Sequence, residues 1–127
     1  MKKKLIYGIG LFLIGLVSAC SAPKNIEIKG GSEVTLTFIN EATMAGMNHN
    51  VIILKPNTNV KKFASDALSY GPSYVPPSQD IVAQTKMTNP GETTQITFTL
   101  PNKKGYYPFV CTFPGHATSM KGTIRVL

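Results

Sequence analysis

The sequence contains few of the residues that usually carry metal or redox chemistry. Its 127 residues include only two cysteines and two histidines, and tryptophan is absent. Charged residues make up 15% of the chain and hydrophobic residues 43%, which excludes an intrinsically disordered polar protein. Eleven glycines and nine prolines, without a Gly-X-Y period, indicate many turns and exclude a collagen-like helix. The length suits one domain with its own core.

Acidic residues are scarce too, since six stand against thirteen basic residues and the formal net charge is +7. Such a charge could indicate a nucleic-acid partner, but Lys2, Lys3 and Lys4 lie in a segment that we expect to be removed. Without residues 1–19, ten basic and six acidic residues remain, a net charge of +4, and the longest basic runs are pairs. A dispersed charge of this size favours solvation and mild steering of an acidic partner, so we expect no nucleic-acid binding.

The first nineteen residues follow the order that is typical of an export signal. A basic start is followed by an apolar run from Leu5 to Val17 and then by two small residues, Ser18 and Ala19. The run is shorter than the roughly 20 apolar residues that span a bilayer. We therefore predict that residues 1–19 are a signal peptide and that the protein is exported. A short signal anchor is the alternative.

The four residues Val17–Cys20 resemble the lipobox of bacterial lipoproteins. In that family the chain is cut just before the cysteine, and the thiol carries diacylglycerol. The resemblance implies that the mature chain begins at a lipidated Cys20 and that residues 20–24 are a tether. Acyl chains would then hold the protein on the periplasmic side of a membrane. Ser21, in place of an aspartate, favours the outer membrane, and an ordinary signal peptide cut nearby is the alternative.

The rest of the chain alternates apolar and polar residues over short segments separated by turn residues. Val34, Leu36 and Phe38, for example, alternate with polar residues, which is the pattern of a strand with one buried face. Between residues 57 and 70 the apolar spacing is helical instead. Short strands with one helix predict an all-β fold, a β-sandwich. The predicted strands are residues 26–29, 33–38, 50–54, 94–100, 106–112 and 122–127, and residues 81–87 are either a further strand or an irregular segment.

A compact set of metal-binding side chains lies between the last two predicted strands. Cys111, His116 and Met120 follow the pattern Cys-x4-His-x3-Met. A thiolate and a thioether are soft ligands and an imidazole is borderline, so the set favours copper over magnesium, calcium or manganese. Zinc rarely uses methionine. The alternatives are an inert buried thiol, an exposed loop histidine and a methionine that only packs.

The second histidine, His49, lies where a loop enters the predicted strand 50–54. In a Greek-key sandwich this entry can reach the end of the molecule that carries the last loop. His49, Cys111 and His116 would then form a trigonal site with Met120 as a weak axial ligand, the arrangement of a blue-copper electron-transfer site. The alternative for His49 is a core histidine whose hydrogen bonds are satisfied.

These residues resemble the small blue copper proteins, the cupredoxins of the azurin and auracyanin type. Residues 111–116 (CTFPGH) and 120–123 (MKGT) match the family's C-terminal signature, and residues 47–50 (MNHN) match its first ligand segment. The resemblance implies a cupredoxin domain over residues 25–127, a Greek-key β-sandwich of about eight strands with a short helix inserted near residues 58–70. It also implies one copper ion, bound by an electron carrier that is not an enzyme. We expect a monomer that serves redox proteins, which the sequence does not identify.

The resemblance implies finer roles around the metal as well. Asn48 would offer its backbone carbonyl as a distant axial contact. Asn50 would tie the two ligand segments together by hydrogen bonds. The backbone N–H groups of Asn50 and Phe113 would point at the Cys111 sulfur, and such donors raise the reduction potential of a metal thiolate. Azurin carries a disulfide for which this chain has no cysteine left.

An uncharged rim is expected around His116, because no charged residue lies between Cys111 and Met120. Electron-transfer encounters bury little area, which suits such a rim. Since protein would fill every coordination position, an electron carrier is favoured over an oxidase or reductase. Copper delivery or storage, and a structural sandwich with a vestigial site, are the alternatives. The expected docking residues are Met44, Met47, Phe113, Pro114 and Ala117, although the two methionines could equally fill the core.

Overall fold

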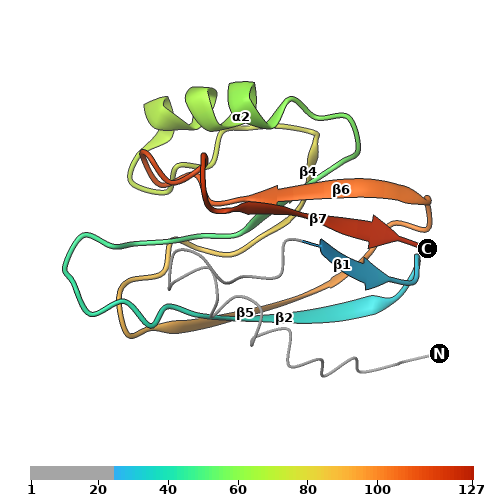
Figure 1. Ribbon diagram of the computed structural model, residues 1–127, viewed down its shortest axis with the longest axis horizontal. Coiled ribbons are helices and arrows are strands. Elements are labelled where there is room, and N and C mark those ends of the chain that lie inside the picture. Colours follow the sequence, from blue (N-terminus) through green and yellow to red (C-terminus); the bar gives the residue numbers. More distant parts are fainter. Residues whose placement is uncertain (1–24) are drawn as a thin grey trace.

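The computed structural model describes residues 25–127. The predictions of a signal peptide over 1–19, a lipidated Cys20 and a tether over 20–24 lie outside these residues. Seven strands, one α-helix and one 3-10 helix follow one another along the described chain (Figure 1). They are β1 (Asn25–Ile28), β2 (Glu33–Ile39), β3 (Ile52–Leu54), α2 (Val60–Ala67), η1 (Leu68–Tyr70), β4 (Ile81–Gln84), β5 (Thr93–Thr99), β6 (Gly105–Val110) and β7 (Lys121–Val126).

The strands form two sheets. One sheet has five strands in the order β1-β7-β6-β3-β4, and the other consists of β2 and β5. β1 runs parallel to β7, whereas every other pair is antiparallel. Figure 1 shows β2 and β5 on one side of the larger sheet and α2 on the other. The predicted fold class, a cupredoxin-like β-sandwich with one short helix, is confirmed.

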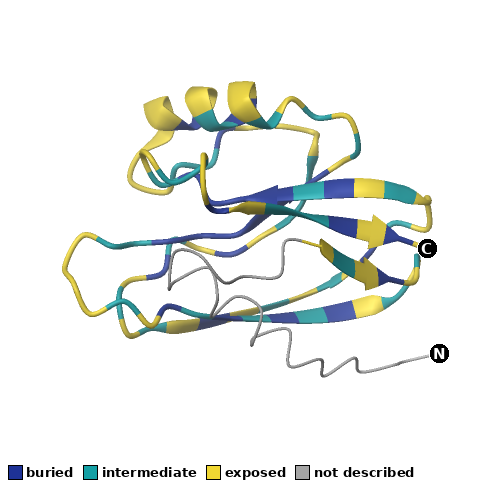
Figure 2. Cartoon of the chain, viewed as in Figure 1, coloured by how far each residue is buried: buried dark blue, intermediate teal, exposed yellow. Residues whose placement is uncertain are grey.

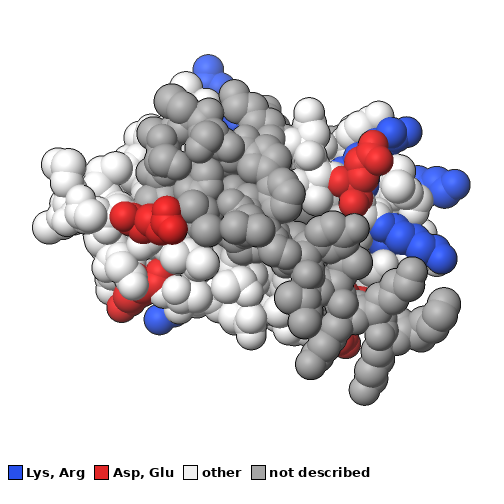
Figure 3. All heavy atoms as spheres, turned by 60° about the horizontal axis from the view of Figure 1, so that its bottom comes forward, with Lys and Arg blue, Asp and Glu red and all other residues white. Residues whose placement is uncertain are grey.

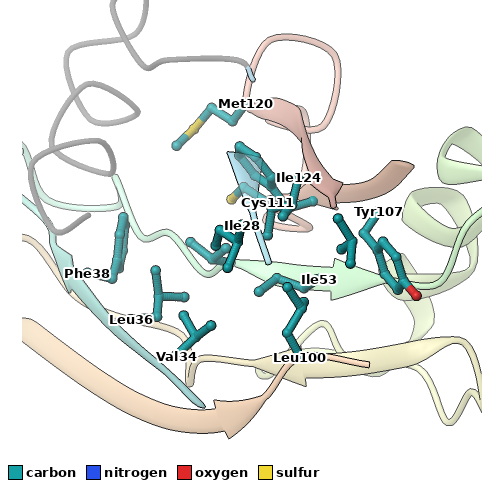
Figure 4. Close-up of a cluster of buried hydrophobic side chains, with 13 residues drawn as sticks. Ile28, Val34, Leu36, Phe38, Ile53, Leu100, Tyr107, Cys111, Met120 and Ile124 are labelled. Carbon is teal, nitrogen blue, oxygen red and sulfur yellow. The ribbon is translucent and has the colours of Figure 1, made fainter. Parts of the chain in front are cut away.

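The main core lies between the two sheets. Along β2, Val34, Leu36 and Phe38 are buried and alternate with more exposed residues, which confirms the period of two (Figure 2). These side chains meet Ile53 and Tyr107 from the larger sheet (Figure 4). Burying each such side chain stabilises the fold by about 1.5–3 kcal/mol, so the alternation fixes which face of β2 points inward.

The central strand β3 is buried on both faces. Ile53 packs into the main core, while Ile52 and Leu54 form a second cluster with Phe63 of α2. The helix begins after Asn59, whose side-chain oxygen accepts a hydrogen bond from a backbone N–H of its first turn. Burial on both faces leaves β3 little freedom to move. The predicted ligand His49 lies just before this strand.

Three predicted strands are shorter than expected, β3 and β4 more so than β6, and seven strands lie within residues 25–127 where the family resemblance implied about eight. The segment before Ile52 leaves the β3 ladder, because His49 pairs with Thr88 in an isolated bridge. β4 ends at Gln84, since the Thr85 side chain accepts the hydrogen bond of the Val51 N–H (2.9 Å). Within residues 25–127 no helix is long and apolar enough to cross a membrane.

Candidate metal centre

Strand pairing brings the predicted ligands to one end of the five-stranded sheet. β3 pairs with β6 so that Ile52 lies opposite Val110, which places the residues just before β3 beside those just after β6. On the other side of β6, the Cys111 N–H donates to the Met120 carbonyl oxygen (2.9 Å), at the point where β6 and β7 begin to pair. His49, Cys111 and Met120 therefore meet because of these two pairings.

The side chains of His49, Cys111 and His116 converge, and their ligand atoms all lie within 4.8 Å of one another. The two imidazole Nδ1 atoms are 3.1 Å apart. The Cys111 Sγ lies 3.8 Å from the Nδ1 atom of His116 and 4.0 Å from that of His49. Two imidazoles and one thiol, with no carboxylate in the cluster, are a donor set that fits copper and disfavours hard cations.

The backbone of His49 is fixed on the side opposite the ligand loop. Its N–H donates to the Thr88 carbonyl (3.1 Å), and the Thr88 N–H donates to the His49 carbonyl (2.7 Å). The fully buried Asn40 reinforces this contact, since its amide donates to the carbonyls of Met47 (2.9 Å) and Thr88 (3.0 Å). Sequence reasoning missed Asn40, because a single asparagine after a strand carries no periodic signal.

The segment from Cys111 to Met120, here called the ligand loop, contains a short turn that positions His116. The His116 N–H donates to the Phe113 carbonyl (3.0 Å), and the Met120 N–H donates to the His116 carbonyl (2.8 Å). Gly115 has a φ of +84°, a left-handed conformation that glycine adopts without strain. Met120 is buried and lies with Cys111 at one end of the main core (Figure 4). The turn thus links His116 and Met120 rigidly.

Asn50 joins the two ligand segments. Its amide oxygen accepts from the Thr112 N–H (2.8 Å), and its amide nitrogen donates to the Thr112 hydroxyl oxygen (2.9 Å). The same hydroxyl donates to the Tyr74 carbonyl (2.6 Å), which ties in the loop after η1. The Tyr74 contact was not predicted from the sequence, because it depends on where a loop of no regular structure happens to pack.

The electrostatics of the cluster favour metal binding at neutral pH. Burial, with a smaller contribution from the neighbouring His116 ring, lowers the pKa of His49 to about 4. Burial also lowers the pKa of His116. Both rings are therefore neutral at pH 7, with a lone pair available to a metal. Burial raises the pKa of the Cys111 thiol, although hydrogen bonds from the backbone N–H groups of Asn50 and Phe113 act in the opposite direction, so metal binding releases a proton.

The expected docking residues differ in exposure. Met44 is 69% exposed, which excludes a core role for it. Pro114 is also exposed, whereas Met47, Phe113 and Ala117 are partly buried. The ring of Phe113 packs against that of His116, with centroids 4.8 Å apart. Asn48, the proposed carbonyl ligand, is partly buried as well.

Comparison with known proteins identifies the family. Residues 21–127 match the family of copper binding proteins described as the plastocyanin/azurin family. The chain is 33% identical over 105 residues to auracyanin-A of Chloroflexus aurantiacus, covering 80% of this chain and 63% of that protein. It is 34% identical over 110 residues to outer membrane protein H.8 of Neisseria gonorrhoeae, covering 82% and 60%. The chain thus spans less than two thirds of the length of these two relatives.

A solved structure agrees with the sequence comparison. Reduced auracyanin from Roseiflexus castenholzii superposes with a TM-score of 0.77 at 35% identity, over 86% of this chain and 88% of that one. The predicted ligands His49, Cys111, His116 and Met120 lie together at one end of the same fold, as a type 1 copper site requires. The chain belongs to the plastocyanin/azurin family of copper-binding proteins.

Proposed function

We propose that the protein is a one-electron carrier with a type 1 copper site and that it is not an enzyme. The convergence of the donor atoms of His49, Cys111 and His116 within 4.8 Å carries this proposal. Copper bound there would accept one electron on reduction to Cu(I) and give it back on oxidation to Cu(II). The side chains belong to segments anchored by strand pairing and by the Asn50–Thr112 hydrogen bonds, so they stay in place in both redox states.

The surroundings of the thiol favour electron transfer over substrate chemistry. Cys111 and Met120 are buried, which keeps water and substrate away from the sulfur side of the site. The N–H groups of Asn50 and Phe113 withdraw charge from the sulfur and favour the reduced state. We propose that the Asn48 backbone carbonyl would be a further, distant contact of the metal, in addition to the Met120 thioether.

Electrons would leave through His116, the ligand that is only partly buried. The exposed residues between Cys111 and Met120 are uncharged, and Met44 is an exposed apolar side chain. We propose that Met44, Met47, Phe113, Pro114 and Ala117 form the rim that contacts redox partners. A rim without charge allows brief encounters with small buried area.

We also propose that the protein is exported and anchored in a membrane through a lipidated Cys20. The proposed parts are a signal peptide over 1–19, a tether over 20–24 and a copper domain over 25–127. The order of basic, apolar and small residues supports it, as does the relative named outer membrane protein H.8. Intact-mass analysis of protein extracted from membranes should show diacylglycerol on Cys20, and an unmodified thiol would contradict the anchor. The Cys20→Ser variant, which carries no lipid, is the control.

Visible absorption and voltammetry of the copper-loaded protein test the electron-carrier proposal. A strong thiolate-to-Cu(II) band and a reversible one-electron wave are expected. Cys111→Ser should remove the band and leave a folded domain, because the hydroxyl is not a soft ligand. A colourless site that exchanges Cu(I) readily would instead indicate copper delivery or storage, and no binding would indicate a structural role.

A further inference from the structure

A groove of about 490 Å³ is lined by residues of α2 and of the ligand loop. Figure 1 shows α2 on the outer side of the five-stranded sheet. α2 turns Phe63 and Ala67 toward the protein interior, and a different face of the helix lines the groove. Of the four copper ligands, none lines it. The groove is therefore distinct from the four copper ligands, although it shares Phe113 and Ala117 with the proposed rim around His116.

One component of the groove is an apolar stripe. Val60 and Ala64 of α2 and Leu68, the first residue of η1, recur at intervals of four residues and so lie along one side of this helical segment. Leu68 is 54% exposed. Phe113 and Ala117 line the opposite wall. Val60 and Ala64 are partly buried, so the stripe rises from the second core cluster to the exposed Leu68. Apolar side chains that reach the surface beside a groove can contact another protein.

The second component of the groove is positive charge. Lys61 of α2 and Lys121 at the start of β7 line the two walls, and both are exposed. Neither forms an ion pair with another residue of the described chain, and no acidic residue lines the groove. The one carboxylate on α2, Asp66, is instead paired with Lys62 (2.6 Å), outside the groove. The groove thus presents two free cations around an apolar stripe.

The groove is joined to the metal centre through the backbone. Two residues of its lining, Thr112 and Phe113, directly follow the ligand Cys111. The Phe113 N–H is also one of the two groups that hydrogen-bond to the Cys111 sulfur. A molecule seated in the groove would therefore lie within two residues of the thiolate ligand.

We propose that this groove docks an acidic segment of a protein redox partner, in which carboxylates flank an apolar side chain. The carboxylates pair with Lys61 and Lys121, and the apolar side chain packs on the stripe formed by Val60, Ala64 and Leu68. That the partner is a redox protein rests on the proposed electron-carrier function. The binding of an acidic segment rests only on the residues that line the groove. The groove adds orientation and charge selectivity to the uncharged contact around His116.

The copper-loaded full chain, kept reduced, can be titrated against a fluorescein-labelled peptide of alternating glutamate and leucine, with fluorescence anisotropy as the readout. The peptide should bind, and added salt should weaken the binding. Lys61→Glu and Lys121→Glu should each weaken it by about three- to tenfold. Ser65→Lys adds a cation to the groove and should strengthen it. A peptide of alternating glutamine and leucine should bind more weakly.

The matched control is Lys62→Glu, which makes the same change in net charge on the same helix but outside the groove. Lys104→Glu is a second control, because Lys104 lies beside Leu127 at the other end of the molecule. Figure 3 shows positive side chains gathered at that end of the visible face. Both controls should change the affinity far less than Lys61→Glu does.

Three results would overturn the proposal: no binding of the acidic peptide, equal weakening by Lys62→Glu and Lys61→Glu, or equal binding of inorganic phosphate and peptide. Lys61→Glu keeps the test decisive even if Lys121→Glu, next to Met120, folds poorly.

Peptide binding requires no electron transfer. Loss of the reversible wave in the wild-type protein would therefore refute the electron-carrier function alone, while absence of binding with an intact wave would refute the groove alone.

Discussion

Acid should destabilise the metal-free protein between pH 6.5 and about 4, and His49 should be a main cause. Its ring is 1% exposed, and burial holds its folded-state pKa at about 4, against 6.5 when solvated. Between these values the unfolded chain binds a proton that the folded chain does not, so lowering the pH favours unfolding. One pKa unit corresponds to about 1.36 kcal/mol, so the free energy of unfolding should fall by up to about 3 kcal/mol.

Two other groups of the described chain have lowered pKa values, and their effects on stability must be separated from that of His49. The pKa of His116 is lowered by burial as well, so this ring also makes the folded protein less stable as the pH falls below 6.5. The lowered pKa of Glu92, caused by hydrogen bonds from the backbone and side chain of Asn89, also removes stability in acid, but only as the pH falls below 4.5. The difference between the wild-type protein and a His49→Gln variant isolates the contribution of His49.

Urea unfolding of the chelator-treated protein, measured at pH 7 and at about pH 4.5, gives this difference. His49→Gln should flatten the pH dependence because glutamine does not titrate, whatever its effect on stability at pH 7. His116→Gln serves as the comparison and should flatten it less, since its ring is less buried. An unchanged pH dependence in His49→Gln would refute the argument that burial of this ring controls acid stability.

Three further substitutions test parts of the site. Met120→Leu should keep the blue colour and raise the reduction potential, because a weak donor to Cu(II) is lost; an unchanged potential would exclude a tuning role. Asn50→Ala removes two hydrogen bonds to Thr112 and leaves buried partners unpaired, so urea unfolding should show a loss of about 1–3 kcal/mol, and wild-type stability would refute the linking role. Gly115→Ala should cost about 1 kcal/mol of stability through its φ of +84°, with no steric contribution because nothing lies within 4 Å of the added Cβ; a neutral result would show that the turn can relax.

The sheet pattern and the ligand set could be predicted because each rests on local spacing. Alternation along residues 33–38 predicted the buried face of β2, and it did so because one side chain in two must reach the core. The spacing of Cys111, His116 and Met120 predicted copper because few sites combine these ligands. His49 could be added because it was the other histidine in the chain.

The supports of the site were harder to predict because they depend on contacts between distant segments. Asn40 holds the His49 segment through carbonyls at positions 47 and 88, and Thr112 reaches the carbonyl of Tyr74. No periodicity marks such residues. The late start of β3, at Ile52 and not at Asn50, was missed for a similar reason, since the bridge between His49 and Thr88 competes with strand pairing.

X-ray absorption at the copper edge of the loaded protein tests the central claim most directly, because it reports which atoms surround the metal. We predict one near sulfur from Cys111 and two near nitrogens from His49 and His116, with the sulfur lost in Cys111→Ser. A copper ion surrounded only by nitrogen and oxygen in the wild-type protein would contradict the account.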